Sequence, residues 1–310
     1  MWPAEVLEYV FSKAPPAILP PVDGDGRVIL YHGMGALSQP PERAISWTTH
    51  PGNALWFAIH CGAGTQLAIA RVRPEDIVFY DAGYHAENEV ILRPGTDMEL
   101  AYEDMIPVEK EQVVPMFASA LIDFQRYGQQ VNSLGYPEES AFQIHGAKHI
   151  LRVLFLSLLY FYNSGDTLSD ADKQVLIYFS LLHDIGRTSD GKDPSHGEQS
   201  VKRIQQQGIR LKGIRLSRKD YRIAELLIRC HCWDDRQGIE EIQAAPGLTR
   251  RDKERACKLY LICKDMDGLD RVRFNGLDYR MLRTEYARRL PLVAGCLLHE
   301  PIQELLHMDA

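Results

Sequence analysis

The stretch from Leu181 to Gly197 reads LLHDIGRTSDGKDPSHG, and it decides how the second half of the chain is interpreted. It closes an apolar segment, QVLIYFSLL, with His183 and Asp184 side by side. Neighbouring side chains on a helix point about 100° apart, so these two polar residues cannot both be ordinary core or ordinary surface positions. A metal ion that binds both side chains would explain the pair.

Helical patterns continue on both sides of this stretch. After residue 115 apolar residues recur at helical spacing in long segments, and we expect an all-α helical bundle over residues 116–310. Six His and Asp residues in it lie near helix ends or on otherwise apolar helices: His149, His183, Asp184, His196, His231 and Asp267. Burying such groups is costly without a partner, and a divalent ion offsets that cost. Any one of these histidines could instead be an ordinary hydrogen-bonded residue, but that reading explains the whole set poorly.

The types of ligand indicate the kind of ion. Imidazole nitrogen and carboxylate oxygen suit a first-row transition metal such as manganese, iron or nickel, whereas magnesium prefers more oxygen ligands. No cysteine is among the six residues, which argues against a structural zinc site. We therefore expect one or two divalent ions in the second half of the chain.

This ordered set resembles the HD-domain metal-dependent phosphohydrolases over roughly residues 140–275. Three segments carry the resemblance: IHGAKHILRV, LLHDIGR with the name-giving His-Asp pair, and KDMDGLDRVR. The resemblance implies four metal ligands, His149, His183, Asp184 and Asp267, with Asp267 preferred to Asp265. His196 and His231 correspond to the positions that hold a second ion in two-metal members; with one ion they would contact the phosphate or the leaving group.

The same resemblance implies hydrolysis of a nucleotide or related phosphoester. A bound ion would lower the pKa of water toward neutrality, and Asp184 would bridge two ions or orient that water. A nearby histidine, His196 or His231, would protonate the leaving oxygen. Arg187 is a candidate to hold the substrate phosphate, and Lys192 is either a second candidate or a solvated surface residue.

The first half of the chain has a different pattern. Short apolar runs rich in Val, Ile, Tyr and Phe are separated by Gly, Pro and Asp, which is typical of strands joined by turns. One helix is expected at residues 51–62, between Pro51 and Gly62. We therefore expect an α+β domain over residues 1–115.

Polar residues recur on three of these expected strands. His32 ends the first, and Ser46 and Thr48 lie on the second. Glu87 and Glu89 lead the third and are expected on one face of it, because residues two apart in a strand point the same way. A carboxylate pair leading an apolar strand is more than a solvated edge requires.

These strands resemble the ADP-ribosyltransferase fold, with its split β-sheet, over roughly residues 25–100. ENEVILRPGT matches the family's Glu-x-Glu strand and SWTT its Ser-Thr strand. The resemblance implies that Glu89 contacts the nicotinamide ribose of NAD, that Glu87 orients an acceptor such as a protein, and that Ser46, Thr48 and His32 line the NAD site. His32 is a departure, because toxin-like members carry Arg there and the poly-ADP-ribose polymerase branch carries His.

Length and composition limit the number of domains, the partners and the cellular location that we expect. A chain of 310 residues predicts two domains, and a net charge of −7 argues against a broad nucleic-acid surface. The six cysteines lack paired zinc spacing, so we expect reduced thiols in a cytoplasmic protein. No apolar run approaches ~18 residues, so we expect no membrane span. Two alternatives stay open: an ADP-ribosyltransferase whose HD-like half regulates or reverses the modification, and a nucleotide sensor without catalysis.

Overall fold

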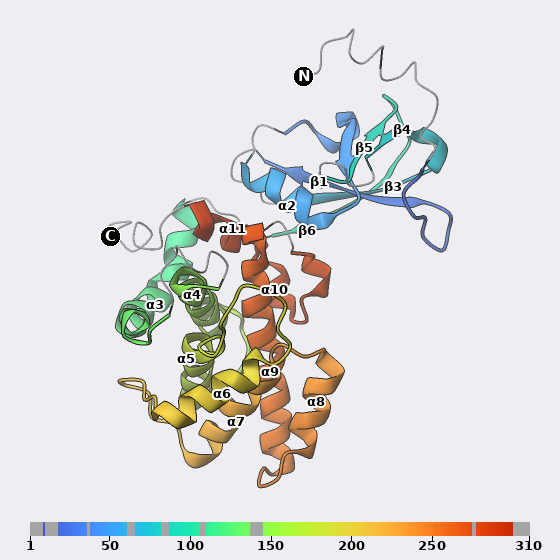
Figure 1. Ribbon diagram of the computed structural model, residues 1–310. Coiled ribbons are helices and arrows are strands. Elements are labelled where there is room, and N and C mark those ends of the chain that lie inside the picture. Colours follow the sequence, from blue (N-terminus) through green and yellow to red (C-terminus); the bar gives the residue numbers. More distant parts are fainter. Residues whose placement is uncertain are drawn as a thin grey trace. The chain divides into compact units, whose positions relative to one another are not determined.

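The computed structural model describes residues 9, 18–35, 38–60, 66–81, 87–105, 110–136, 145–274 and 277–299. The chain divides into two compact units (Figure 1). The first comprises residues 1–109, 274–281 and 289–296, and the second comprises residues 110–273, 282–288 and 297–310. The sequence predicts one boundary, after residue 115. In the structure the second compact unit begins at residue 110, and the first unit also includes two later segments of the chain.

The first unit contains an antiparallel sheet of six strands. The strands are β1 (Val28–Met34), β2 (Ser46–Thr48), β3 (Gln66–Val72), β4 (Ile77–Tyr80), β5 (Glu89–Leu92) and β6 (Glu99–Asp104), in the order β4-β5-β2-β1-β3-β6. The predicted α+β character is confirmed. The expected split is not seen among the described strands, because β2 pairs with both β1 and β5 and joins the two halves into one sheet.

Helix α2 (Pro51–His60) packs closely on β1 of this sheet. A Cβ atom at Gly33 would lie 1.9 Å from the carbonyl oxygen of Ala54, so only glycine permits this approach. Short 3₁₀ turns, η1 (Pro41–Arg43) and η2 (Pro74–Asp76), connect the strands. The buried residues of the sheet include Val28, Leu30, Trp47, Ala68, Ala70, Val72, Val90 and Leu92.

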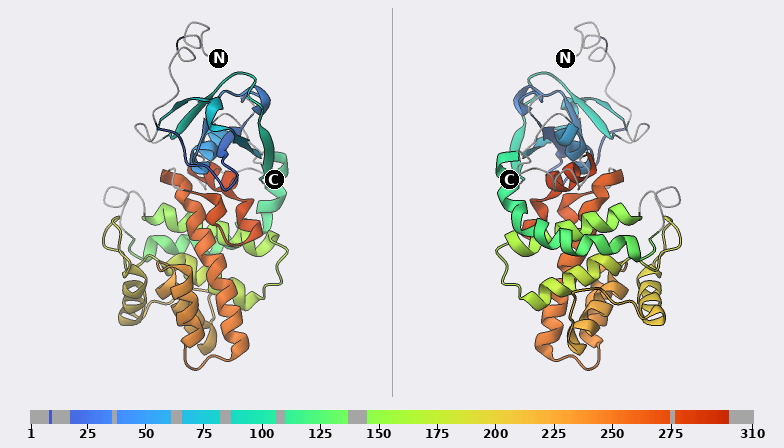
Figure 2. Two further views of the ribbon diagram at one scale, coloured as in Figure 1. Left: turned by 90° about the vertical axis from the view of Figure 1, so that its right-hand side faces the viewer. Right: turned by 90° about the vertical axis from the view of Figure 1, so that its left-hand side faces the viewer.

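All regular elements that the structure describes in the second unit are helical, which confirms the predicted class (Figure 2). They are α3 (Lys110–Gly128), η3 (Gln129–Ser133), α4 (Ala147–Asn163), α5 (Asp170–Leu182), α6 (His196–Gln207), α7 (Arg218–Cys230), α8 (Asp235–Ala244), α9 (Arg250–Leu269), η4 (Asp270–Phe274) and α10 (Glu285–Arg288). Two further elements are η5 (Tyr279–Met281), which precedes α10, and α11 (Pro291–His299), which follows it. Among the described helices, none combines the length and the apolarity needed to cross a membrane.

Two helix starts in the second unit are tied together by one arginine. Ser169 caps α5 and Ser217 caps α7, each accepting a hydrogen bond from the backbone of the third residue of its helix, Asp172 or Asp220. Arg255 of α9 donates to both of these aspartates. Helices α5 and α7 pack against each other. Their other ends, away from these caps, carry the candidate site.

Candidate metal centre

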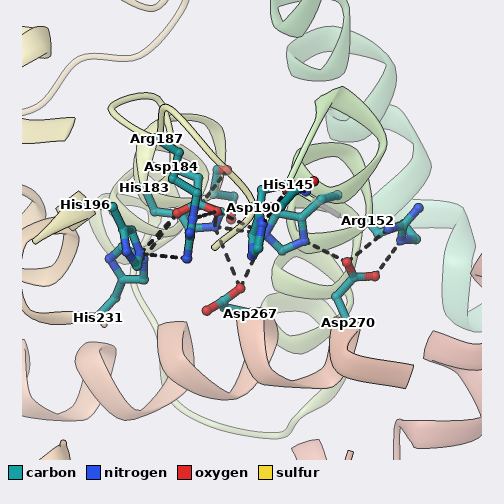
Figure 3. A network of polar contacts seen from close by, with 12 residues as sticks. His145, Arg152, His183, Asp184, Arg187, Asp190, His196, His231, Asp267 and Asp270 are labelled. Carbon is teal, nitrogen blue, oxygen red and sulfur yellow. Dashed lines mark hydrogen bonds and ion pairs between the residues drawn. The ribbon is translucent and has the colours of Figure 1, made fainter. Parts of the chain in front are cut away.

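The six residues predicted as metal ligands come together in the second unit (Figure 3). They come from five segments: His149 from α4, His183 and Asp184 from the end of α5, His196 from the start of α6, His231 from the end of α7 and Asp267 from α9. Five of them are at most 5% exposed. The exception is Asp267, whose side chain is 31% exposed and marks the open side of the cluster.

The turn after α5 fixes the His-Asp pair. His183 ends the helix, and its ring stacks on Phe179 with centroids 5.0 Å apart. Gly186 then lies so close to α6 that a Cβ atom would be 2.2 Å from the backbone nitrogen of Ser200. The Ser200 hydroxyl accepts a hydrogen bond of 2.9 Å from the Gly186 nitrogen. The glycine of the HDIG sequence therefore holds α6 against the turn.

A second glycine brings the remaining histidines together. A Cβ atom at Gly197 would lie 2.4 Å from the carbonyl oxygen of Ile228, so the start of α6 can pack against the end of α7 only without a side chain here. His196 is the first residue of α6 and His231 immediately follows α7. Their Nε2 atoms are 2.8 Å apart as a result.

The four histidines all use Nδ1 in hydrogen bonds away from the centre. Three of these bonds go to backbone carbonyl oxygens, from His183 to Ser180 at 3.2 Å, from His231 to Ile228 at 2.7 Å and from His196 to Asp193. His149 donates to a carboxylate oxygen of Asp270 at 2.6 Å. Because carbonyl and carboxylate oxygens only accept, Nδ1 carries the proton, so each ring in its neutral form presents the lone pair of Nε2. These lone pairs face the interior of the cluster.

Asp184 lies between two pairs of histidines. Its Oδ1 atom is 3.3 Å from His196 Nε2 and 3.5 Å from His231 Nε2, whereas Oδ2 is 3.7 Å from His149 Nε2 and 3.9 Å from His183 Nε2. Oδ1 is buried and has no hydrogen-bond donor among the described residues. Burying a carboxylate oxygen without a donor is costly, so this atom points to a bound cation.

Asp267 completes the group around His149 and His183. Its Oδ1 atom lies 3.4 Å from His149 Nε2 and 3.8 Å from His183 Nε2, and the two Nε2 atoms are 3.2 Å apart. The cluster therefore has two lobes that share Asp184, one with His149, His183 and Asp267 and the other with His196 and His231. Each lobe brings nitrogen and oxygen ligands within reach of one ion.

Most of the pKa shifts in the cluster favour the protonation states that bind a cation, which are neutral imidazole and ionised carboxylate. Burial lowers the pKa of His183 to about 3 and that of His196 to about 4, so both rings stay neutral near pH 7. Burial alone would raise the pKa of Asp184 and Asp267, but the neighbouring histidines hold both below the usual range. For His149 the effect of burial is outweighed by the neighbouring carboxylates of Asp267 and Asp270, which raise its pKa.

Several supporting residues were not predicted from the sequence. Asp270 accepts hydrogen bonds from His149 and from the Nε and Nη2 atoms of Arg152, so it fixes the ring of one predicted ligand. Cys232 lies beside the second lobe, because its sulfur and the candidate ligand atoms of His196 and His231 all lie within 4.8 Å of one another. The only signal for Cys232 was its position next to His231, and the argument against a cysteine ligand considered only the six residues.

The other predicted residues near the centre have distinct partners. Arg187 donates from Nε to Asp184 Oδ2 at 3.0 Å, so it holds that carboxylate directly. His145, one turn before His149, lies 2.9 Å through Nδ1 from Asp190 Oδ1. Lys192 is exposed. Asp265, the less favoured alternative to Asp267, instead accepts hydrogen bonds from the backbone of Arg283 and Thr284.

In the first unit, one hollow is lined by all five predicted residues: His32, Ser46, Thr48, Glu87 and Glu89. Ser46 donates from its hydroxyl to Glu89 Oε1 at 2.6 Å, across the paired strands β2 and β5. Glu87 is not on the strand as expected, because β5 begins at Glu89 and Asn88 has a φ of +51°. The Thr48 hydroxyl instead donates to the backbone oxygen of Glu87 at 2.7 Å, which keeps Glu87 at the hollow.

Comparison of the chain with protein-family models, with curated proteins and with solved structures gave no match.

Proposed function

We propose that the second unit is a metal-dependent phosphohydrolase of the HD type, acting on a nucleotide or related phosphoester. The observation that carries this proposal is the convergence of four Nε2 lone pairs and two carboxylates, with every Nδ1 already occupied. Lone pairs and negative charge that face one another repel unless a cation lies among them. The unsatisfied, buried Oδ1 of Asp184 beside the Nε2 atoms of His196 and His231 supports a metal ion in the second lobe.

The donor set fits one divalent ion in each lobe. Neutral imidazole and carboxylate ligands suit manganese, iron or nickel, and Asp184 can offer one oxygen to each ion. Ions held here would supply an activated water and offset charge on the phosphoryl oxygens. Cys232 beside the second lobe would favour a softer ion there than the first lobe takes.

The protein's own residues have separable roles in this proposal. Asp270 fixes the His149 ring through Nδ1 and so aims Nε2 at the first lobe. Arg187 holds the shared carboxylate of Asp184 and lies at the edge of the cluster, where it can also contact a substrate phosphate. A phosphoester can approach the cluster from the side of Asp267, whose side chain is partly exposed.

The experiment is a product analysis with the full chain. Nucleoside phosphates and phosphodiesters are incubated with Mn²⁺, with and without EDTA, and products are separated by chromatography and mass. Phosphate or phosphomonoester release that stops with EDTA and with Asp184→Ala supports the proposal. Asp278→Ala is the matched control, because Asp278 is an aspartate paired with Arg280 in the first unit. Product that forms equally with Asp184→Ala contradicts the proposal.

A second function is supported by the hollow of the first unit. Five residues implied by the ADP-ribosyltransferase resemblance line that one hollow, and Ser46 hydrogen-bonds Glu89 as such a site requires. We therefore also propose that this hollow binds NAD, with Glu89 stabilising positive charge that develops on the ribose when nicotinamide leaves. Glu87 is placed at the rim to orient an acceptor.

The same assay separates the two functions when NAD is included. Nicotinamide release that survives EDTA but is lost with Glu89→Gln assigns transferase or NAD-hydrolysing activity to the first unit. Ser46→Ala should weaken the reaction, because it removes the 2.6 Å hydrogen bond that orients Glu89. The absence of product from every substrate would favour the nucleotide-sensing alternative over both enzymes.

A further inference from the structure

A second hollow in the second unit lies between the end of α6 and the start of α7, outside the metal centre. It is lined by Ile204 and Gln205 of α6, by the connecting loop, and by Arg218 and Tyr221 of α7. Arg210 of the loop lines it as well. Two arginines and an aromatic ring therefore share one concave surface.

Positive charge is concentrated here in a chain that is acidic overall. Six of the thirteen residues from Arg210 to Arg222 are Arg or Lys, and all six are exposed. The segment's single acidic residue, Asp220, is buried and binds Arg255. No acidic side chain lines the hollow, and among the described residues no ion pair joins Arg210 or Arg218 to a carboxylate. Positively charged side chains that lie close together without carboxylate partners attract an anion.

The hollow also has an apolar wall and a fixed shape. Ile204 is buried, and the half-buried ring of Tyr221 packs edge-to-face on Tyr178 with centroids 5.7 Å apart. The loop is tied down at two points: the backbone nitrogen of Lys212 donates to Gln130 at 2.6 Å, and that of Arg215 donates to Gln174 at 2.7 Å. The arginines are therefore presented by an anchored loop and a capped helix.

We infer that this hollow binds a small ligand that carries both phosphate and a flat aromatic ring, such as a nucleoside phosphate. Guanidinium groups bind phosphate oxygens in pairs, so Arg210 and Arg218 would hold the phosphates. The ring would lie against Ile204 and Tyr221. A single-stranded nucleic acid binds along a groove of about 4–16 nucleotides with several aromatic rings for stacking, whereas the lining of this hollow has one aromatic ring, Tyr221, so it favours a mononucleotide over a polymer.

The position of the hollow links it to the metal centre. Helix α6 begins at His196 and ends beside the hollow, and α7 begins at the hollow and ends before His231. The two helices pack side by side (Figures 1 and 2). At 1.5 Å per residue their lengths of 12 and 13 residues separate the two sites by roughly 18–20 Å. A ligand bound in this hollow is therefore too far from the metal centre to be the substrate of that centre.

The test is calorimetric binding of ATP to the full chain in EDTA, so that no metal mediates binding. We expect saturable binding at one site, weakened at least about tenfold by Arg210→Gln with Arg218→Gln. The matched control is Arg236→Gln with Arg250→Gln, which removes the same charge from two exposed arginines on α8 and α9. The control should leave the ATP affinity unchanged.

Three results would overturn the inference. The first is an ATP affinity that the Arg210/Arg218 double variant leaves unchanged, which would place the nucleotide elsewhere. The second is binding of RNA oligonucleotides that strengthens with length while ATP does not bind, which would indicate a polymer surface. The third is an equal effect of the control pair, which would indicate a non-specific charge effect. Because the assay contains no metal, each outcome is independent of whether the phosphohydrolase proposal holds.

Discussion

The Nε2 atoms of His196 and His231 lie 2.8 Å apart, while the Nδ1 atom of each ring donates to a backbone carbonyl oxygen. When both imidazoles are neutral, their Nε2 lone pairs face each other, and Asp184 Oδ1 lies 3.3 Å from His196 Nε2. The arrangement is stable when a cation lies among the three atoms. It distinguishes a two-ion centre from one built only on His149, His183 and Asp267.

The first prediction concerns this pair. His231→Gln removes one of the two nitrogens of the second lobe, so the number of manganese ions bound per chain should fall from two to one. The ion in the other lobe should remain, because its ligands are unchanged. Metal content after dialysis, measured by mass spectrometry, gives the count. His50→Gln in the first unit is the control, and an unchanged count in His231→Gln would show that the second lobe holds no ion.

The second prediction concerns Cys232, which lies beside the same lobe. If its sulfur binds the ion there, the chain loaded with Co²⁺ should show a thiolate-to-cobalt charge-transfer band in the near ultraviolet. Cys232→Ser should remove the band, whereas Cys257→Ser, which changes a thiol hydrogen-bonded to Gln243, should keep it. Bound cobalt without the band would exclude the cysteine as a ligand and leave the histidine ligands in place.

The third prediction concerns the residue behind His149. Asp270→Asn keeps the size of the side chain but weakens its hydrogen bond to His149 and its ion pair with Arg152. Losing such a partner of a metal ligand typically lowers metal affinity about 10–100-fold. A competition titration with a chelating dye measures the affinity. An affinity within about twofold of the unsubstituted chain would mean that the His149 ring is held by other contacts.

The fourth prediction concerns stability. Arg255→Gln removes the hydrogen bonds that join Asp172 and Asp220 at the starts of α5 and α7, and charged hydrogen bonds of this kind contribute about 1.5–3 kcal/mol each. The two bonds would sum to about 3–6 kcal/mol, but solvent screens the 24% exposed arginine, so we expect a smaller loss of about 2 kcal/mol in the free energy of unfolding. Urea denaturation followed by helical circular dichroism measures it.

The control for this stability prediction is an exposed ion pair. Arg236 pairs with Glu240 four residues along α8, with 88% of the arginine side chain exposed. Arg236→Gln should therefore change the free energy of unfolding by less than ~0.5 kcal/mol. If Arg255→Gln has an equally small effect, the two caps do not depend on the arginine.

The positions of the clustered histidines and aspartates were predictable because their signal is local. His183 and Asp184 are adjacent at the end of an apolar helix, and His196 opens the next helix after a polar turn, so a few residues of sequence mark each position. Asp270 and Arg152 were not predictable in this way. They are 118 residues apart in the chain, and nothing near either residue indicates that they meet behind His149.

The secondary structure shows the same division between local and distant causes. Strand β3, with the sequence QLAIARV, is one of the short apolar runs of the first half that were expected to form strands. Strand β6 was missed, because ELAYED is charged and largely exposed, and it forms by pairing with β3. Residues 278–290 lie in the part expected to be all-α, but they form two short elements, η5 and α10, separated where Arg283 and Thr284 donate backbone hydrogen bonds to Asp265.

The most direct test of the central claim is anomalous X-ray scattering from a crystal of the full chain soaked in Mn²⁺. The structure predicts two anomalous peaks, one within about 2.2 Å of Nε2 of His149 and His183 and one within the same distance of Nε2 of His196 and His231, with Asp184 between them. Manganese peaks elsewhere on the chain and none among these six residues would contradict the metal centre, and the phosphohydrolase proposal would fall with it.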